Sequence, residues 1–548
     1  MRPSLRQVTE QTYDVIVIGG GINGSGIARE AALRGLATLL VEKDDFCAGT
    51  SGRSSKLIHG GLRYLEHREW RLVRESLRER EALLQAFPRL VRPLPFLAPV
   101  YDGGPHGLTT LRAGMTLYDL FSWGKSMPRH RRLSKRELLA LEPGLSAHGL
   151  RGGFEFYDCQ ALFPERLCVE VAVQALAAGA TALNHAQVTD LLITDGRVQG
   201  VRLRDGASGQ EADVLGRLVV NATGPWADRI CRMANPQATP RVGGTLGSHL
   251  VASRHPNQLG RHAIFGFAGA DNRAFFILPW REYQLIGTTD IRYEGDPDQA
   301  QTSDAEVDYL LTETNHLLPR RPLTRTDVLY TYAGVRALPP SEAASEGEIT
   351  RRHVIHDHQR EEGLQGLISI VGGKLTNFRE VSREAIDLAA RKLDRGRDAA
   401  PWPSQAWAGL PASPAELKEL ATAHELEPTQ VDYLATLYGP RLSDVLALAD
   451  SEPSLRQRIC PHNPDIAAQA VYAIQHELAL TLADVLVRRT GIGLSRCLGL
   501  DCAPTAARLL TRYAAWDEER AAREVAEYRR YITATYHTPM RDRRTTPA

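Results

Sequence analysis

The spacing of apolar residues changes twice within the first forty or so positions of the chain. Residues 14–18 form a short apolar run that is typical of a buried strand. Residues 22–34 have helical composition and stop at a glycine, and residues 36–41 form a second apolar strand that ends at an acidic residue. The pattern predicts a strand, a helix and a second strand in immediate succession.

A glycine motif connects the first strand to the helix. Gly19, Gly21 and Gly24 have the G-x-G-x-x-G spacing. The first glycine permits a tight turn, the second lets the backbone approach a pyrophosphate, and the third lets helix and strand pack closely. The helix N-terminus offers free N–H groups to phosphate, and Glu42 is placed to accept hydrogen bonds from ribose hydroxyls. Such a turn alone is weak evidence, but the complete unit predicts a dinucleotide site.

Two later segments repeat this design. A strand at 217–220 leads into the small residues of 221–226 (NATGPW), where the backbone can pass close beneath a nucleotide before a helix that begins near Ala227. Residues 366–376 (GLISIVGGKLT) have the pattern of a buried strand, paired glycines and the start of a helix that runs to residue 393. The positive end of that helix, with Lys374 beside it, can face an anionic ring.

The segment 47–64 (CAGTSGRSSKLIHGGLRY) is rich in glycine, hydroxyl and basic residues and cannot form a core. It either forms a solvated loop or lies along a cofactor, with its hydroxyl and N–H groups facing phosphate. Because it follows the second strand of a dinucleotide unit, the second interpretation is favoured.

Two further segments have helical patterns. Residues 66–84 predict an amphipathic helix whose buried stripe contains Trp70, Val73, Leu77 and Leu84. Residues 115–132 place aromatic and apolar side chains just before a basic cluster. That combination suits an anionic bilayer surface, and it suits equally well a core helix with a basic end. Both interpretations stay open.

The middle of the chain mixes β-like and helical segments. Strands of one inserted sheet are expected at 151–158 and 188–203, and helices at 164–178 and 302–318. Further strands are expected at 275–280, 284–288 and 328–335. Three short motifs there invite chemistry, although an ordinary loop explains each one alone: 247–249 (GSH), 287–290 (GTTD) and 332–336 (YAGVR).

After a linker at 396–404 the pattern is helical. Helices are expected at 413–424, 428–437, 441–449, 465–488 and 515–536. Residues 472–491 predict one continuous buried helix ending at a glycine. Glu477 and Asp484 within it have no obvious metal-binding partners, so this region is interpreted as structural or as a cap.

Composition excludes several classes of function. A chain of 548 residues is too long for one domain, so two or three are expected. With 66 basic and 65 acidic residues there is no electrostatic footprint for nucleic acid. The seven cysteines are scattered without a C-x-x-C pair, so no disulfide framework or metal site is indicated. There is neither a secretory signal nor an apolar run of about 18 residues, which favours a cytoplasmic protein.

Seven motifs, in this order, resemble the FAD-dependent, quinone-linked glycerol-3-phosphate dehydrogenases: GGGINGSGIA, TSGRSSKLIHGGLRYLE, NATGPWAD, GSH, IGTTD, TYAGVR and VGGKLT. The resemblance implies an α/β fold. A glutathione-reductase-like FAD-binding Rossmann domain carries an inserted β-rich substrate domain and is followed by a C-terminal all-α domain. The implied boundaries are 13–100, 150–240 and 346–395 for the FAD-binding domain, 101–149 and 241–345 for the substrate domain, and 405–548 for the helical domain. Residues 241–245 and 341–348 diverge from the family.

The same resemblance implies an activity. The family oxidises sn-glycerol 3-phosphate to dihydroxyacetone phosphate by hydride transfer to FAD and passes the electrons to a membrane quinone. A homodimer, bound peripherally to the inner face of the cell membrane, is expected. Three alternatives stay open: an oxidase of the same substrate that uses oxygen, a flavin amine or amino-acid oxidase, and a non-catalytic flavoprotein. The first typically carries an insertion for which this chain has little room, and the second lacks the arginine set.

Site residues also follow from the resemblance. FAD contacts are expected from Gly19, Gly21, Asn23, Gly24, Glu42, Thr50, Ser51, Ser54, Ser55, Lys56, Leu57, His59, Gly60, Gly61, Ala222, Thr223, Gly224, Trp226, Gly373, Lys374, Leu375 and Thr376. Substrate contacts are expected from Arg63, Tyr64, His249, Arg336, Arg351 and Lys374. Guanidinium groups suit a phosphate dianion because they bind it bidentately.

Three of these residues are expected to be catalytic. His249 is the proposed base, because a neutral imidazole can accept the hydroxyl proton. Arg336 holds the substrate phosphate, and Lys374 either stabilises negative charge on the N1–O2 edge of the reduced flavin or reaches the substrate.

Overall fold

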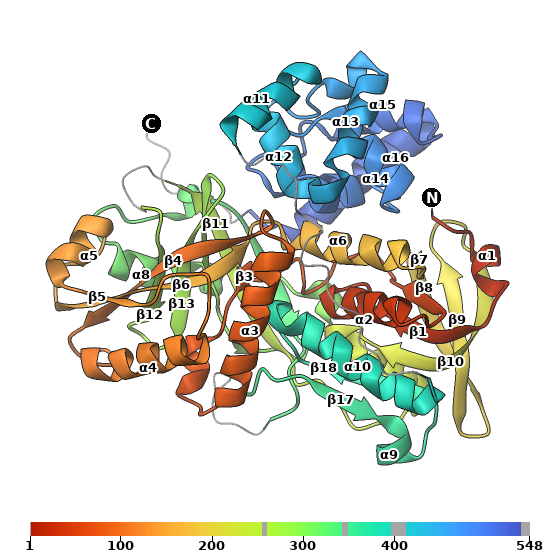
Figure 1. Ribbon diagram of the computed structural model, residues 1–548, viewed down its shortest axis with the longest axis horizontal. Coiled ribbons are helices and arrows are strands. Elements are labelled where there is room, and N and C mark those ends of the chain that lie inside the picture. Colours follow the sequence, from red (N-terminus) through yellow and green to blue (C-terminus); the bar gives the residue numbers. More distant parts are fainter. Residues whose placement is uncertain (1, 255–259, 342–348, 396–412, 539–548) are drawn as a thin grey trace.

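The computed structural model describes residues 2–254, 260–341, 349–395 and 413–538. Two sheets lie next to each other, and the C-terminal helices gather on one side of both (Figure 1). The linker expected at 396–404 lies outside the described residues. The mixed α/β fold with a C-terminal helical unit is confirmed.

The first sheet is the nucleotide-binding type. In the described chain its strand order is β17-β18-β10-β1-β2-β7, with β9 and β8 extending from β10. Strands β18, β10, β1, β2 and β7 run parallel, so their carboxyl ends lie at one edge. Its strands are β1 (Tyr13–Ile18), β2 (Thr38–Val41), β7 (Thr181–Leu183), β8 (Ala186–Thr194), β9 (Arg197–Asp205), β10 (Glu211–Asn221), β17 (Val354–Asp357) and β18 (Leu367–Val371).

Three helices pack side by side on one face of this sheet. Helix α2 (Ile22–Leu33) packs between α6 (Pro164–Ala177) and α10 (Phe378–Leu393), as Figure 1 shows. Gly26 permits the close approach to α10, because a Cβ there would lie 2.5 Å from the Ser382 hydroxyl. The apolar faces of these helices and the strands form one buried cluster with residues such as Val15, Ile27 and Ile386.

The second sheet is mostly antiparallel and forms the neighbouring layer. Its order among the described residues is β15-β11-β14-β13-β12-β4-β6-β3, with β16 beside β11 and β5 beside β6. Its strands are β3 (Leu57–Ile58), β4 (Val91–Tyr101), β5 (Arg131–Leu133), β6 (Leu150–Ala161), β11 (Thr245–Ser253), β12 (Ala263–Phe267), β13 (Ala274–Trp280), β14 (Tyr283–Gly287), β15 (Ile291–Arg292) and β16 (Val328–Arg336).

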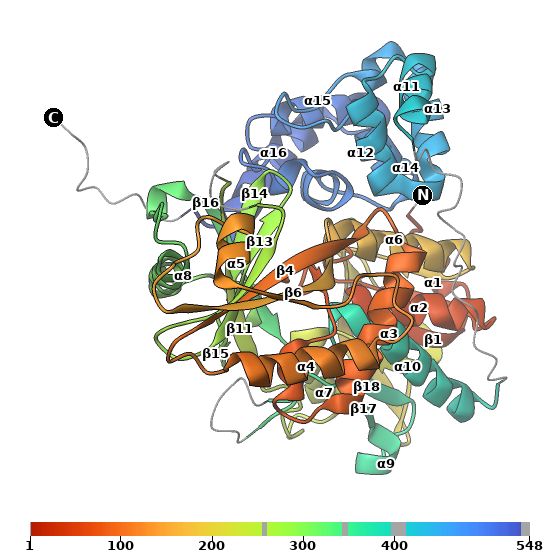
Figure 2. The same ribbon diagram turned by 60° about the vertical axis from the view of Figure 1, so that its left-hand side comes forward.

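The remaining helices lie around the two sheets and in the C-terminal unit. In Figure 2, α8 and α5 flank the second sheet and α4 lies at the side opposite the C-terminal helices. The bounds are α1 (Leu5–Thr9), α3 (Trp70–Ala86), α4 (Leu108–Phe121), α5 (Lys135–Leu141), α7 (Ala227–Ala234), α8 (Asp304–Leu317), α9 (His358–Glu362), α11 (Pro414–Ala423), α12 (Pro428–Tyr438), α13 (Leu442–Ser451), α14 (Ala467–His476), α15 (Ala503–Tyr513) and α16 (Glu518–Thr535).

The expectation of one inserted sheet for 151–158 and 188–203 is wrong. Strand β6 pairs with β4 along most of its length and so belongs to the second sheet. Strands β8 and β9 instead extend the first sheet through the antiparallel pairing of β9 with β10. Alternation of apolar residues identifies a strand but not its partner, because partner choice depends on distant segments. The domain boundaries themselves stay a prediction.

Two helix predictions also need correction. Residues 472–491 do not form one helix: α14 ends at His476, Leu478 has a φ of +59°, and a π-helical turn occupies Asp484–Arg489. Helix α15 had no expected counterpart. Trp70, expected on a buried stripe, is the first residue of α3 and is 49% exposed, because α3 begins four residues later than the periodicity suggested.

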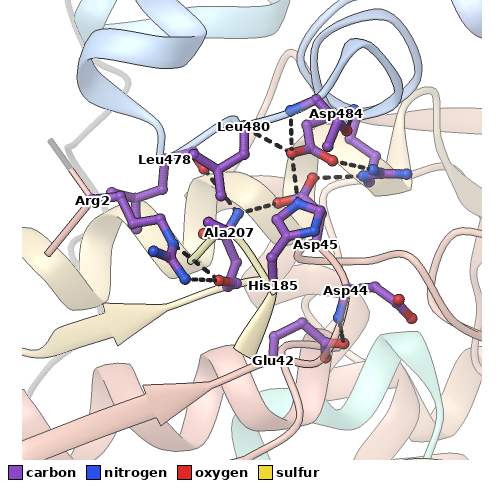
Figure 3. Close-up of polar contacts among 12 residues, drawn as sticks. Arg2, Glu42, Asp44, Asp45, His185, Ala207, Leu478, Leu480 and Asp484 are labelled. Atoms are coloured by element: carbon purple, nitrogen blue, oxygen red, sulfur yellow. Dashed lines mark hydrogen bonds and ion pairs between the residues drawn. The ribbon is translucent and has the colours of Figure 1, made fainter. Parts of the chain in front are cut away.

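Buried ion pairs explain the interruption after α14. Asp45, in the loop after β2, is completely buried and accepts hydrogen bonds from Arg488 and Arg489 of the C-terminal unit. Asp484 accepts from Arg488 at 2.6 Å and bonds the His185 ring at 2.8 Å (Figure 3). These buried ion pairs join the C-terminal unit to the first sheet. A straight helix over residues 472–491 would not bring the paired side chains together.

Replacing Arg489 tests how strongly this buried cluster supports the fold. Arg489→Met removes one of the two guanidinium groups that pair with the buried Asp45 carboxylate. This loss should lower the free energy of unfolding by about 3–5 kcal/mol. Denaturant unfolding followed by fluorescence measures the loss. The control is Arg202→Met, since Arg202 pairs with Asp213 on the surface and its removal should change the free energy of unfolding far less. Equal stability of the two variants would contradict the prediction.

Candidate active site

The loops that follow β1, β10 and β18 enclose a cavity of about 340 Å³. Because these strands are parallel neighbours, the turns after Ile18, Asn221 and Val371 meet at the same edge of the sheet. Open parallel sheets bind ligands at this edge. Residues of the 49–59 segment line the same cavity, so that segment lies along it rather than projecting into solvent.

The glycines of the first turn leave no space for side chains. Gly19 has a φ of +108°, and a Cβ there would lie 2.6 Å from the Ala222 carbonyl oxygen. A Cβ on Gly24 would lie 1.8 Å from the Gly19 carbonyl oxygen, so this glycine lets α2 pack on the turn. The Ser51 hydroxyl accepts from the Ile22 N–H at 3.0 Å, which fixes the 47–55 segment against the start of the helix. The helix start stays open to the cavity, as a phosphate site requires.

Glu42 lies at the end of β2 and lines this cavity. Its carboxylate accepts from the backbone N–H of Gly20 at 2.6 Å and from that of Asp44 at 2.8 Å. Burial, followed by the neighbouring Asp44 carboxylate, raises the pKa of Glu42 to about 7. The side chain is therefore held rigidly between the glycine turn and the next loop, in the position expected for a ribose-binding acid.

A second cavity of about 170 Å³ adjoins the first and shares Ser55, His59, Tyr64, Arg336 and Arg351 with it. Its wall contains four guanidinium groups and an aromatic patch from the second sheet: Arg63, Arg273, Arg336, Arg351, Phe96, Phe156, Phe265 and Phe276. Such a concentration of positive charge in a small cavity is suited to a dianionic group.

Asp290 organises two of these arginines. Its Oδ1 accepts from Arg336 at 2.8 Å, and its Oδ2 accepts from Arg351 at 2.7 Å. Burial alone would raise the pKa of Asp290, but the two guanidinium groups outweigh it and hold the pKa below its usual range. Arg273 donates to the Asp290 carbonyl oxygen at 2.6 Å. The Asp290 carboxylate thus orients two guanidinium groups and its backbone carbonyl a third, which leaves an excess of positive charge facing the cavity.

His249 is buried at the boundary between the two sheets. Its ring stacks on Tyr332 with a centroid distance of 4.9 Å, and its Nε2 bonds the Ser55 hydroxyl at 2.8 Å. Burial, reinforced by the charges of Arg336 and Lys56, lowers the pKa of His249 well below its ordinary value. The imidazole is therefore neutral at pH 7, and its Nδ1 is buried without a hydrogen-bond partner.

Lys374 lies just after the paired glycines that follow β18. Its ammonium group donates to the Ser76 hydroxyl at 2.6 Å and lies 4.7 Å from the centre of the Tyr64 ring. Burial lowers the pKa of Lys374 to about 7 despite the nearby carboxylate of Glu75. This amine can change its charge near neutral pH, and an anion placed beside it would favour the charged form.

Most of the expected site residues line the two cavities. The first is lined by Gly19, Gly21, Asn23, Glu42, Thr50, Ser51, Ser54, Ser55, Leu57, His59, Tyr64, Ala222, Thr223, Gly224, Trp226, His249, Arg336, Arg351, Gly373, Lys374, Leu375 and Thr376. The second includes Gly61 and Arg63. Gly24, Lys56 and Gly60 line neither. The Lys56 ammonium is buried against Glu165 at 2.7 Å, and Gly60 packs against Leu77 and Tyr118.

Sequence reasoning did not identify three polar residues of the site: Asp290, Arg273 and Ser76. Asp290 ends the 287–290 motif, which was noted but explained equally well by an ordinary loop. Arg273 and Ser76 carry no local signal, because their neighbours have ordinary strand and helix patterns. Arg273 reaches the site because it immediately precedes β13 of the second sheet, and Ser76 because α3 packs against the segment that follows Lys374.

Comparison with known proteins places this geometry in a family. Residues 14–377 match the family model for FAD dependent oxidoreductases, and residues 404–521 match that for the C-terminal domain of alpha-glycerophosphate oxidase. Glycerol-3-phosphate dehydrogenase of Synechocystis sp. is 42% identical over 539 residues, which cover 96% of this chain and 97% of the relative. The chain belongs to the FAD-dependent glycerol-3-phosphate dehydrogenase family.

Other members of the family are also similar along the whole chain. Glycerol-3-phosphate dehydrogenase 2 of Mycobacterium tuberculosis is 36% identical and covers 96% of this chain and 89% of its own length. A glycerol-3-phosphate dehydrogenase from Bacillus halodurans has been solved by X-ray crystallography in complex with FAD. Its sequence is 28% identical to this chain, and the two structures match with a TM-score of 0.77 over 96% of each chain.

The cavities of this family member fit the cofactor. The glycine turn after β1 brings the backbone at the start of α2 to the cavity wall, Glu42 is fixed at the next strand end, and Lys374 stands beside the helix start after β18. These three features suit the pyrophosphate, the ribose and the flavin ring of FAD respectively. The cofactor expected from the sequence is confirmed as FAD.

Proposed function

We propose that this chain oxidises sn-glycerol 3-phosphate to dihydroxyacetone phosphate and passes the electrons through FAD to a membrane quinone. The observation that carries this proposal is the arginine-lined cavity, which opens directly onto the FAD cavity and shares Arg336 and Arg351 with it. A phosphate held by these groups would place a three-carbon chain at the boundary of the two cavities, beside His249 and Lys374.

The arginines bind and orient the substrate. Arg336 and Arg351 are held by the two oxygens of Asp290, so their guanidinium planes are fixed before substrate arrives. Arg63 and Arg273 add positive charge on other sides of the same cavity. A preorganised bidentate site costs little rotamer entropy on binding and favours phosphate over carboxylate substrates, because the extra charge needs a dianion.

A neutral imidazole is available to accept the hydroxyl proton. His249 is uncharged at pH 7 because burial lowers its pKa, and Ser55, which lines both cavities, hydrogen-bonds its Nε2. Lys374 supplies positive charge next to the paired glycines and favours negative charge on the adjoining edge of the ring. FAD, when bound, supplies the hydride acceptor.

The proposal of a quinone acceptor rests on how the lengths of related dehydrogenases and oxidases compare with that of this chain. The alpha-glycerophosphate oxidase of Streptococcus pyogenes is 31% identical, and its alignment spans 593 positions although this chain has 548 residues. The oxidase therefore contains segments without a counterpart here, whereas the Synechocystis dehydrogenase aligns with this chain over nearly equal lengths. We also propose the family's homodimer, and a location at the inner face of the cell membrane, because the acceptor is a lipid.

An exposed apolar patch formed by the start of α3 and the end of α4 is the proposed membrane contact. Trp70, Leu120 and Trp123 are 49%, 58% and 76% exposed. The guanidinium of Arg129 lies over the Trp123 ring at 5.2 Å, so positive charge borders the apolar surface. This combination suits insertion among anionic headgroups. No helix in the described part of the chain is both long and apolar enough to cross a bilayer.

Removal of Arg336 tests the substrate site. Arg336→Ala should lower kcat/KM for glycerol 3-phosphate, because a charge-assisted phosphate contact is lost. The fall should correspond to a loss of about 2–5 kcal/mol of transition-state stabilisation. Steady-state kinetics with a soluble dye acceptor measures the change, and flavin absorbance confirms that FAD is retained. Arg325→Ala is the matched control, since Arg325 also pairs with aspartates but lines neither cavity. An unchanged kcat/KM in the Arg336 variant removes Arg336 from the phosphate site.

Anaerobic titration of the holoenzyme tests the reaction itself. Glycerol 3-phosphate should bleach the flavin absorbance, and a water-soluble quinone should restore it much faster than dissolved oxygen does. Glycine and proline serve as control substrates and should leave the flavin oxidised. Rapid reoxidation by oxygen with stoichiometric peroxide would identify an oxidase, and no bleaching by any of these compounds would leave the chain a non-catalytic flavoprotein.

Vesicle binding tests the membrane contact. The protein should co-sediment with phosphatidylglycerol vesicles and only weakly with phosphatidylcholine vesicles, because the patch combines apolar and positive groups. The double variant Leu120→Ser/Trp123→Ser should stay in the supernatant while keeping its activity with a soluble acceptor. Leu215→Ser, which removes an equally exposed leucine from β10, is the control and should sediment like the parent protein. Sedimentation of the double variant would place the contact elsewhere.

A further inference from the structure

Three of the seven cysteines meet in the C-terminal unit, although Cys460 is distant from the other two in sequence. Cys460 precedes α14, Cys497 lies in the loop after the π-helical turn, and Cys502 is the N-cap residue of α15. The Cys460 and Cys497 sulfurs are 3.7 Å apart. Donor atoms of Cys460, Cys502 and Asp501 all lie within 4.8 Å of one another.

Cys460 belongs to both arrangements, and Cys497, which lies outside the group of mutually close donor atoms, would have to move toward Cys502 or Asp501 to complete a tetrahedral metal site. With Zn–S bonds of about 2.3 Å, two thiolates on one tetrahedral zinc ion lie about 3.8 Å apart. The Cys460–Cys497 distance agrees with this value without a disulfide bond between them. Thiolate ligands with one harder donor are typical of structural zinc, and the Asp501 carboxylate supplies that donor. We propose that Cys460, Cys497, Cys502 and Asp501 bind one Zn²⁺ ion.

The surroundings of the sulfurs support the proposal independently. The Asn463 amide donates to the Cys460 sulfur at 3.3 Å, and the Ser495 hydroxyl lies 3.2 Å from the Cys497 sulfur. Donors aimed at sulfur stabilise thiolates and orient metal ligands.

The proposed fourth ligand is oriented as well. The His462 Nε2 lies 3.2 Å from an oxygen of Asp501, which leaves the other carboxylate oxygen available to a metal. Asp501 is exposed, so an ion can enter from solvent. A histidine that bonds a ligating carboxylate is a common outer partner in metal sites.

The described chain contains one other group of possible ligands, and it lacks these properties. Asp45, His185 and Asp484 also lie close together, but both carboxylates already accept hydrogen bonds from Arg488. A divalent cation there would face a buried guanidinium. The Cys460 cluster instead presents thiols, which lose their protons when a metal binds.

Zinc at this position would join the segment before α14 to the loop before α15. Neither cavity is lined by a described residue after Thr376, so the ion would stabilise the C-terminal unit rather than take part in the reaction. The proposal is therefore independent of the proposed function.

Metal analysis of the holoenzyme tests the site. Protein purified without a polyhistidine tag and under reducing conditions should contain about one zinc per chain by mass spectrometry, as expected for a closed thiolate site. Cys460→Ser and Cys497→Ser should lose the metal. Asp501→Asn, an exposed change, should weaken Zn²⁺ binding by about 10–100-fold in competition with a chromophoric chelator. Cys231→Ser is the control, because it removes a buried thiol outside the cluster.

Flavin content and denatured thiol titration accompany each sample. Unchanged flavin shows that a variant is folded, so metal loss then supports the site. The proposal is overturned if the parent protein takes up no Zn²⁺ under reducing conditions, or if Cys460→Ser and Cys231→Ser bind the same amount. Titration of five rather than seven thiols in the unreduced parent would indicate a disulfide in place of the metal and would also overturn it.

Discussion

Parallel pairing of β1, β10 and β18 is the constraint on which the rest of the structure depends. It brings three turns to one edge of a sheet, although the first and the last are more than 350 positions apart in the chain. Each turn consists of glycine or other small residues. Backbone N–H groups and helix N-termini then point into a common space. The FAD cavity is the direct consequence of this pairing. Side chains of the second sheet, such as His249 and Arg336, line the same cavity beside these turns.

The second sheet contributes chemistry through a balance of buried charges. Asp290 neutralises part of the charge of Arg336 and Arg351 and holds both side chains in position. Without it, two guanidinium groups would repel each other in a site with little water. With it, the cavity keeps a net positive charge that a phosphate dianion can complete. Burial, reinforced by the positive charges of Arg336 and Lys56, lowers the pKa of His249 and keeps its ring neutral.

Buried charge also joins the C-terminal unit to the first sheet. Arg166 and Glu477 form a bidentate pair, with hydrogen bonds of 2.7 and 2.5 Å, and Asp45 binds Arg488 and Arg489. Asp45 belongs to the loop that begins with Glu42, a residue that lines the FAD cavity. The C-terminal unit lines neither cavity, yet it fixes the loop that lines one of them.

The sequence by itself determined the glycine turns, the strands and helices around them, and the arginine and histidine motifs, because these features depend on local spacing and backbone freedom. It could not determine which sheet β6, β8 and β9 join, since strand pairing depends on residues far away in the chain. It could not reveal Asp290 as the partner of two arginines, or the breaking of the helix expected at 472–491 by buried ion pairs. Nor could it show that Cys460 meets Cys497 and Cys502, because Cys460 lies far from both along the chain. Local chemistry is readable in order along the chain, whereas contacts between distant side chains exist only after the sheets and helices have packed.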